Sequence, residues 1–474
     1  MKKNAKSVFK NLYYTVAANF ATLGISVLLN LFVPKLLGVT EYSYWQLYVF
    51  YSSYVGFLHF GWIDGIYLKI GGEEYEDLNK KSLGTQFWYL MIFELLLSSV
   101  VVIWALFFMP RTSQSLILIF TAIVSVITIM KTYVLYIFQS TNRIREYAQL
   151  SRNDRYLYIL FIGIYFAIGG RNFYWLIIMD ILSKLIFTVR GVFKIQDMVA
   201  QKWIPLKKIY SEILDNINIG SKLMLSNIAS MLILGAIRFF VQHKWSIETF
   251  GKLSFTLSIS NMFLTFVNAV GVVMFPLLRR TDQAKLPKLF TTLRNVFVPI
   301  TYGILLFYIP AKLVLGAWLP AYSDSLMYMG ILFPMVIYEG RMSLLINTYL
   351  KSMRKEKTIL MVNVVTLVVS LLLSLLTVYV IQNLIISICL IIFSLALRCI
   401  LAEYFLCRSM DLNFIYQSII ETILTLMFII SNLAFKSSLV SFSIYGVCYI
   451  VYLVAVHRFT INSGKDLLSL IKEN

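Results

Sequence analysis

Charge is scarce in this sequence, and acidic charge is the scarcest. Only 14% of the 474 residues are charged, with 23 Asp and Glu against 42 Lys and Arg, and there are 4 cysteines, 9 prolines and 3 histidines. In a soluble domain about a quarter of the residues are charged, so this composition excludes a soluble domain. Hydrophobic residues make up 59% of the chain and the mean hydropathy is +0.77. The chain is therefore predicted to be embedded in a membrane.

Motifs of soluble catalysis are also missing. There is no G-x-x-x-x-G-K-[ST] phosphate loop, no H-E-x-x-H zinc motif and no Ser/His/Asp grouping. The longest polar segment, 194–218, has about 25 residues, too few for a domain. The cysteines have no zinc-like spacing and are expected to be free in apolar surroundings: Cys389, Cys399, Cys407 and Cys448. We therefore expect no enzymatic activity and no metal or other cofactor, and we place the function inside the membrane.

Long apolar runs are abundant. A helix crosses the hydrocarbon with roughly 20 apolar residues, and about fourteen stretches meet this requirement. They lie near 12–33, 42–66, 83–108, 115–139, 156–170, 173–193, 219–240, 250–277, 291–314, 326–349, 358–380, 384–406, 414–432 and 437–457. The predicted fold class is an all-α polytopic membrane protein.

The basic residues orient the chain. About 27 of the Lys and Arg fall on the side of the N-terminus, about 6 on the opposite side and about 9 inside the predicted helices, which follows the positive-inside rule. We therefore place the N- and C-termini in the cytoplasm, and we interpret the basic N-terminus as the start of a retained first helix. The basic residues behind the net charge of +19 are expected to contact anionic lipid headgroups, and no nucleic-acid partner is expected.

Ionisable residues inside predicted spans are the candidate functional residues, because each costs at least roughly 2.5–3.5 kcal/mol at the bilayer centre. Asp180 and Lys184 are four residues apart and are predicted to neutralise each other. Glu403 and Glu421 lie near helix ends and are expected to reach the interface. Glu94 has no charged neighbour on its helix face, so it is either buried in its protonated form or coupled to a cation or proton.

The remaining charges inside the spans are mostly cationic. Few acids offset them locally, apart from Glu339 near Arg341. Guanidinium groups bind phosphate through paired hydrogen bonds, and a dry cavity strengthens this interaction. The predicted substrate-binding residues for an anionic cargo are Lys131, Lys222, Arg238, Arg294, Arg341 and Arg398.

The stretch "GWIDGIYLKIGG" (Gly61–Gly72) places an acid between two glycines near the inner end of a predicted span. Asp64 and Lys69 are about 140° apart around a helix, so they make a poor pair. Lys222 or Arg294 is the predicted partner of Asp64, in an inner gate that a phosphate-bearing anion would open by competing for that partner. Asp64, Glu94 and Glu339 are accordingly the predicted gating or coupling residues.

The two halves of the chain carry a weak internal repeat. "VTEYSYWQL" and "IETFGKLSF" each precede a long apolar helix, and pairing Tyr42 with Phe250 aligns the halves in the same orientation.

Three segments resemble the bacterial polysaccharide-repeat flippases of the Wzx type: "ETFGKLSFTLSISNMFLTFVNAVGVVMFPLLRR" (Glu248–Arg280), "FGWIDGIYLKIGG" (Phe60–Gly72) and "INTYLKSMRKEKTILMVNVV" (Ile346–Val365). The last segment has Ser352-Met353 where the family usually has Ala-x-Gly. The order and spacing of the segments, and the number of apolar stretches, are similar to the family along essentially the whole chain.

The resemblance implies a MATE-like exporter of the MOP superfamily, with two six-helix bundles around a central cavity and two added C-terminal helices. The expected divisions are 1–200, 201–410 and 411–474. The implied cargo is an undecaprenyl-diphosphate-linked oligosaccharide, flipped across the bacterial inner membrane by alternating access. Implied partners are membrane lipids and the polysaccharide polymerase machinery, and coupling to H⁺ or Na⁺ stays open.

Three alternatives stay open. A small-molecule or drug antiporter would keep the fold, although a cavity for cationic drugs should be rich in acids. A lipid II flippase would share the cationic cavity. A non-transporting membrane scaffold would not need so many charges inside its helices.

Overall fold

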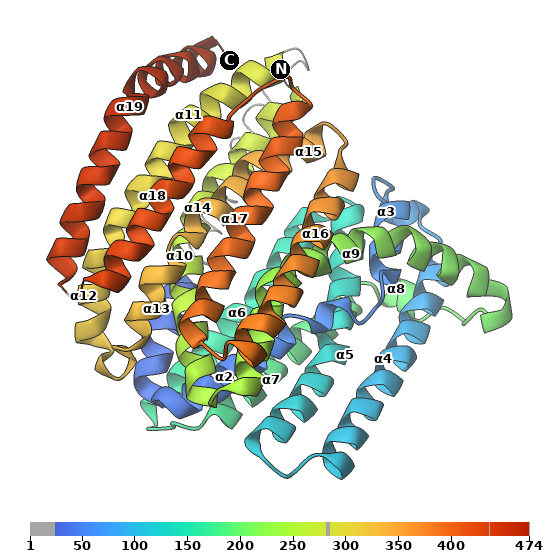
Figure 1. Cartoon of the computed structure of the whole chain (residues 1–474). Coiled ribbons are helices and arrows are strands. Elements are labelled where there is room, and N and C mark those ends of the chain that lie inside the picture. The colour runs from blue at the N-terminus through green and yellow to red at the C-terminus, as the bar shows by residue number, and fades with distance from the viewer. Residues whose placement is uncertain (1–23, 281–284, 436, 474) are drawn as a thin grey trace. The chain divides into compact units, whose positions relative to one another are not determined.

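The computed structural model describes residues 24–280, 285–435 and 437–473, with side chains in these ranges except in 266–280 and 465–473. Every regular element in the described ranges is a helix (Figure 1). The chain divides into two compact units, Leu36–Ile228 and a second unit that combines Met1–Lys35 with Ala229–Asn474. We call them the N-unit and the C-unit. The boundary between them falls within one helix, α9 (Leu206–Lys244).

The N-unit is built from long helices joined by short turns. Its elements are α2 (Val39–Ser52), α3 (Trp62–Lys69), α4 (Lys80–Phe108), α5 (Ser113–Ser140), α6 (Ile144–Ala167), α7 (Phe173–Phe193), α8 (Gln196–Val199) and the first part of α9. Helix α5 is the central element, because α2, α3, α4, α6 and α7 all pack against it.

The C-unit contains the second part of α9 and the later helices. They are α10 (Ile247–Arg280), α11 (Leu286–Ile304), α12 (Tyr308–Trp318), α13 (Ser325–Leu332), α14 (Met335–Gly340), α15 (Asn347–Ser352), α16 (Glu356–Leu375), α17 (Leu384–Arg408), α18 (Ile415–Ala434) and α19 (Ser438–Glu473). A π-helical turn, η6 (Arg341–Ile346), joins α14 to α15. The apolar helix Gly24–Leu37 reaches the C-unit, where Trp318 Nε1 donates to the Leu31 carbonyl.

The prediction of a polytopic helical membrane protein is confirmed. In the described residues eight helices are long and apolar enough to cross a membrane, or nine if Ser325–Leu332 and Met335–Ser352, which are bent by 42°, form one span. The predicted number of about fourteen stays a prediction. Helix α6 is not among the eight, and it begins at Ile144 instead of near 156, because a charged first half precedes its apolar half.

The boundary between the compact units lies within α9, and the expected divisions 1–200, 201–410 and 411–474 stay a prediction. Helices α18 and α19 pack on α13 and α11 within the C-unit. Helices α2 and α10 begin in the register of the weak repeat, so Tyr42 and Phe250 take the same position in their helices. Both side chains are fully buried in their own units.

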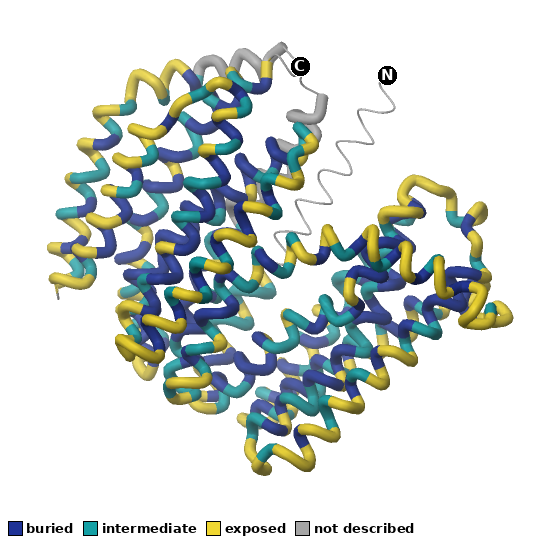
Figure 2. The backbone as a smooth tube through the Cα atoms, turned by 45° about the vertical axis from the view of Figure 1, so that its right-hand side comes forward, coloured by how far each residue is buried: buried dark blue, intermediate teal, exposed yellow. Residues whose placement is uncertain are grey.

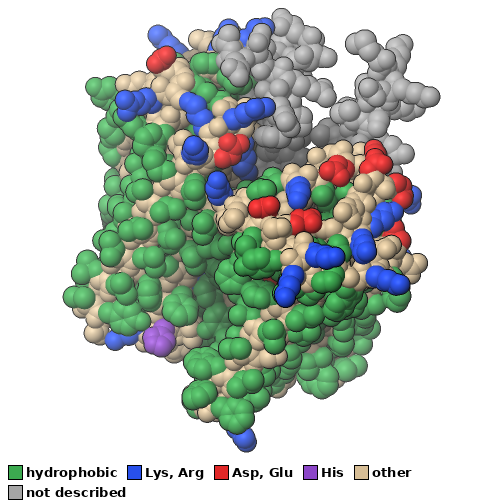
Figure 3. Space-filling view, turned by 90° about the vertical axis from the view of Figure 1, so that its right-hand side faces the viewer, with side chains coloured by type: hydrophobic (Ala, Val, Ile, Leu, Met, Phe, Trp, Pro, Cys, Tyr) green, Lys and Arg blue, Asp and Glu red, His purple; other side chains and the backbone are tan. Residues whose placement is uncertain are grey.

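The surfaces of both units suit a membrane. Buried positions follow one side of many helices, and exposed positions follow the other (Figure 2). Many exposed side chains are apolar, such as Leu96, Val100 and Phe107 on α4, which are 63%, 63% and 78% exposed. On the faces seen in Figure 3, zones of hydrophobic side chains are bordered by charged ones. Such a surface is suited to contact with the hydrocarbon chains of lipids.

Helix α3 contacts α9 backbone to backbone through small residues. Gly61 and Gly65 are four residues apart on one side of the contact, and Asn216 and Gly220 are four apart on the other. A Cβ atom on Gly65 would lie 1.8 Å from the Asn216 carbonyl oxygen, and one on Gly220 would lie 2.0 Å from the Gly61 carbonyl oxygen. This is the small-xxx-small packing by which membrane helices approach closely. The glycines around Asp64 therefore serve helix packing.

We expect Gly65→Ala to destabilise the protein by about 1–3 kcal/mol, because the added methyl group overpacks the contact with α9. The matched control is Gly163→Ala on α6, where a Cβ would meet nothing within 4 Å. Thermal unfolding of both purified variants measures the difference. Equal melting temperatures for the two variants would contradict the close contact.

Candidate functional site

Four buried charged side chains form a closed network in the C-unit, which we call the charge quartet: Arg294 on α11, Arg341 at the start of η6, Glu403 on α17 and Glu421 on α18. Arg294 donates from Nε to Glu403 Oε1 at 2.8 Å and from Nη2 to Glu421 Oε2 at 3.0 Å. Arg341 donates from Nη1 to Glu421 Oε2 at 2.9 Å and from Nη2 to Glu403 Oε2. Each arginine thus bridges both glutamates.

The quartet is nearly dry. Its side chains are only 2–4% exposed. Two positive and two negative groups leave it without net charge, which lowers the cost of burying it. The Arg294 guanidinium also lies 4.6 Å from the centre of the Phe414 ring, and Ser418 Oγ donates to Glu403 Oε2 at 3.3 Å. One donor is unused, because Arg341 Nε has no hydrogen-bond partner among the described residues.

Three tyrosine hydroxyl groups form hydrogen bonds next to Glu421 of the quartet. Tyr302 donates to the Glu421 backbone carbonyl at 2.8 Å, and Tyr338 donates to Thr425 Oγ1 at 3.0 Å. Tyr445 on α19 donates to the Tyr302 carbonyl at 2.8 Å. These bonds connect the quartet to two further helices, α14 and α19, so the packing of the C-unit fixes its geometry.

The structure corrects two predictions here. Arg294 and Arg341 were expected to be unpaired cations, and each forms two ion pairs instead. Glu403 and Glu421 were expected to reach the interface, yet they are 3% and 1% exposed. The physical reason is the same for both errors: a guanidinium in a low-dielectric interior requires an anion, and the glutamates supply it from distant parts of the sequence.

Arg398, in the same unit, is also paired. It donates to Glu339 Oε1 at 3.1 Å, to Asn363 Oδ1 at 3.0 Å and to Ser230 Oγ at 2.7 Å. The predicted neighbour of Glu339 was Arg341, so the structure reassigns this acid to Arg398. This one guanidinium therefore connects four helices: α9, α14, α16 and α17.

The N-unit holds two smaller charge clusters. Asp180 and Lys184 pair at 2.5 Å, as predicted from their spacing, and Tyr48 donates to the same carboxylate at 2.6 Å. Lys131, expected to be unpaired, donates to Asp154 at 2.5 Å. The sequence reasoning missed Asp154 because it placed this residue in a loop, whereas the residue lies inside α6.

Glu94 on α4 differs from the other buried acids. Its side chain is fully buried, and neither carboxylate oxygen has a hydrogen-bond partner in the part of the chain that the structure describes. An ionised carboxylate in this place would lack all compensation. The observation agrees with a protonated side chain, one of the two states expected from the sequence.

Asp64 lies beside a histidine. His59 Nε2 is 3.9 Å from Asp64 Oδ2, and His59 Nδ1 accepts a hydrogen bond from the Gly61 amide at 3.1 Å. Neither proposed partner is bound to it: Lys222 is exposed on α9, and Arg294 belongs to the quartet. The pairing of Asp64 with either residue in an inner gate stays a prediction. As expected, Lys69 does not pair with Asp64. Its Nζ atom lies 3.8 Å from Glu212 Oε1 instead.

Arg238 completes the predicted cationic set. Its Nη2 atom donates to Ser254 Oγ at 2.9 Å, and its guanidinium lies 5.5 Å from the centre of the Phe250 ring. The predicted binding residues are thus divided between the units: Lys131 and Lys222 in one, Arg238, Arg294, Arg341 and Arg398 in the other. Their contact with a substrate stays a prediction, as does the central cavity. Within the described residues no cluster of His, Cys, Asp and Glu could hold a metal ion.

Comparison with known proteins identifies the fold. No family model and no curated protein matches the chain. A lipid II flippase MurJ in an inward closed conformation matches with a TM-score of 0.65 and 12% identity, over 95% of this chain and 100% of that one. An inward-facing multidrug resistance MATE family transporter of the MOP superfamily matches with a TM-score of 0.61 and 11% identity, over 84% of this chain and 98% of that one.

The chain therefore has the fold of MOP-superfamily transporters. Of these two proteins, the first is a flippase and the second is a transporter.

We expect Arg294→Gln to destabilise the protein by about 3–5 kcal/mol, because it leaves two buried carboxylates to one guanidinium. Adding Glu403→Gln restores neutrality and should recover a large part of the loss. Lys252→Gln is the control, since Lys252 pairs at 2.9 Å with the exposed Asp324 and should cost under about 1 kcal/mol. Thermal unfolding in detergent measures all three. A double variant less stable than Arg294→Gln would contradict the network.

Proposed function

We propose that the protein is a MOP-type flippase that moves an undecaprenyl-diphosphate-linked oligosaccharide from the cytoplasmic to the outer leaflet of the bacterial inner membrane. The observation that carries the proposal is the placement of arginine and lysine side chains inside the helices of a transporter fold. Lys131, Arg294, Arg341 and Arg398 are 9%, 2%, 1% and 4% exposed. A diphosphate is an anion that such groups bind well.

The quartet suggests how binding and movement are connected. Its two guanidinium groups are satisfied by glutamates, so a diphosphate must replace a carboxylate to bind them. The unused Arg341 Nε provides one further donor for such an exchange. Since the glutamates and arginines come from α11, η6, α17 and α18, the exchange would loosen contacts among four helical segments. A ligand drives alternating access only through such a difference in affinity between states.

Energy coupling would use a different group. Glu94 is the buried acid without a described partner, and it lies in the N-unit, away from the quartet in sequence. A carboxyl group that is neutral when buried and ionised when it meets water or Na⁺ would connect an ion gradient to a conformational change.

Two related functions differ from this proposal in their cargo. The similarity to the lipid II flippase extends over 95% of this chain, against 84% for the MATE transporter. Both matches show the fold alone, and the buried cations of this chain favour an anionic, lipid-linked cargo over a cationic small molecule. Lipid II itself also carries a diphosphate, so a peptidoglycan-precursor flippase is the second candidate, and the glycan is what separates the two.

We expect the neutral double variant Arg341→Gln/Glu421→Gln to lose transport while it still inserts and folds, because it removes one guanidinium without leaving an unpaired charge. Complementation of strains lacking either a polysaccharide flippase or the lipid II flippase is the measurement. The matched control is Asp180→Asn/Lys184→Gln, which removes the self-neutralised pair of the N-unit and should complement.

The strain that the native chain rescues identifies the cargo class. Normal surface polysaccharide from the Arg341/Glu421 variant, at native expression, would contradict binding at the quartet. Rescue of neither strain by the native chain would contradict the proposed cargo.

We expect Glu94→Gln to remain folded, because a neutral amide replaces a neutral acid of the same shape. If Glu94 couples transport to an ion, this variant loses its dependence on an imposed proton or sodium gradient. Transport assays in vesicles with and without each gradient measure this. A gradient response equal to that of the native protein would exclude Glu94 as the coupling group.

A further inference from the structure

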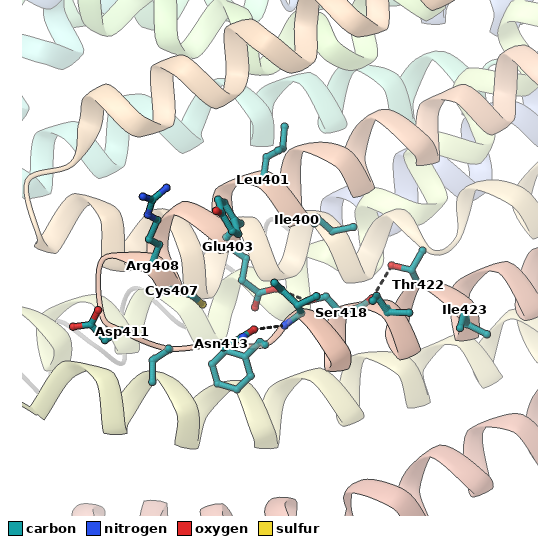
Figure 4. A pocket seen from close by; sticks show the side chains of 15 residues that line it. Ile400, Leu401, Glu403, Cys407, Arg408, Asp411, Asn413, Ser418, Thr422 and Ile423 are labelled. Carbon is teal, nitrogen blue, oxygen red and sulfur yellow. Dashed lines mark hydrogen bonds between the residues drawn. The ribbon is translucent and has the colours of Figure 1, made fainter.

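A cavity of about 640 Å³ lies between α17 and α18, within the C-unit (Figure 4). It exists because α18 packs mainly against α13 and α19, and the loop 409–414 separates it from α17. The volume lies in the range of small-molecule sites. The proposed flippase mechanism assigns no role to this cavity.

One wall of the cavity is suited to a hydrocarbon chain. Ile415, Ile419 and Ile423 succeed one another every four residues along α18, and each is slightly over half exposed. On the α17 side, Leu401 and Tyr404 also line the cavity. In a membrane protein, a cavity bordered by exposed apolar side chains opens sideways to the lipid. A lipid chain can therefore enter without crossing water.

The loop end of the cavity carries two charges of opposite sign. Arg408 is in the last turn of α17 and Asp411 is in the following loop, and both line the cavity (Figure 4). Both side chains are exposed, and neither forms an ion pair or a side-chain hydrogen bond with a described residue. The positive-inside pattern places this loop on the cytoplasmic side. The charges thus lie where the headgroups of the inner leaflet lie.

The deep side of the cavity adjoins the quartet. Glu403 and Ser418 line it, and so does Phe414, whose ring lies against Arg294. Water entering here would reach the quartet and weaken its ion pairs, since the strength of such pairs depends on a low dielectric. An amphiphile that fills the cavity would keep this side dry.

We propose that this cavity binds a phospholipid of the inner leaflet with a primary ammonium headgroup, such as phosphatidylethanolamine. The lipid phosphate lies against Arg408, its ammonium lies against Asp411, and one acyl chain follows the isoleucines of α18. An anionic lipid such as phosphatidylglycerol fits less well, because its headgroup has no cation to pair with Asp411. A choline headgroup cannot donate hydrogen bonds to Asp411.

The test uses the purified full-length chain, stripped of native lipid and then mixed with equal amounts of dioleoyl phosphatidylethanolamine, phosphatidylglycerol and phosphatidylcholine. Native mass spectrometry counts the lipids retained. We expect the native chain to retain phosphatidylethanolamine about three- to tenfold more than either other lipid, the range that weak charged contacts give. Arg408→Gln and Asp411→Asn should each remove this preference.

Matched controls remove the same charges elsewhere: Arg458→Gln on α19 and Asp77→Asn, both at exposed positions. These should keep the preference, and gel filtration checks that every variant is folded. Stronger retention of phosphatidylglycerol, equal retention of all three lipids, or no retained lipid would overturn the proposal. So would an unchanged preference in Arg408→Gln and Asp411→Asn.

Discussion

The requirement that a charge in hydrocarbon must find an opposite charge governs the C-unit. Two arginines and two glutamates meet this requirement together, and they come from α11, η6, α17 and α18. Because each arginine bridges both glutamates, no single segment can move without breaking ion pairs on its neighbours. The hydroxyl groups of Tyr302, Tyr338 and Tyr445 extend this constraint outward. Replacing such a network by apolar residues is often tolerated for stability alone, so its presence is better explained by function.

The charges of the N-unit follow the same requirement in simpler form. Lys131 and Asp154 make one pair, and Asp180 serves both Lys184 and Tyr48. Glu94 differs, because neither of its carboxylate oxygens has a hydrogen-bond partner in the described part of the chain, and this is why we propose it for ion coupling. Each of these buried cations is neutralised by an acid. In the proposed mechanism, a diphosphate that displaces a carboxylate would change that charge balance.

Local features of the site could be predicted from the sequence, and distant ones could not. The Asp180–Lys184 pair follows from helical spacing, and the membrane class follows from composition. Glu403 and Glu421 were misplaced because an acid near a helix end can either reach the interface or find a buried partner. Only the tertiary structure shows that Arg294 on α11 is that partner. Asp154 was not recognised as the partner of Lys131, because the charged first half of α6 resembles a loop in sequence and the helix was predicted to begin only after it. The role of the glycines beside Asp64 could not be predicted from the sequence, because it depends on the close packing of α3 on α9.

The measurement that tests the central claim most directly is flipping by the purified chain in liposomes. A fluorescent oligosaccharide is linked to undecaprenol through a diphosphate in one preparation and through an uncharged ether in the other, and its appearance in the outer leaflet is followed over time. If buried guanidinium groups recruit the cargo through its diphosphate, the charged lipid flips and the neutral one does not. Equal rates for both lipids, or no flipping of the charged lipid by a correctly folded chain, would contradict this account.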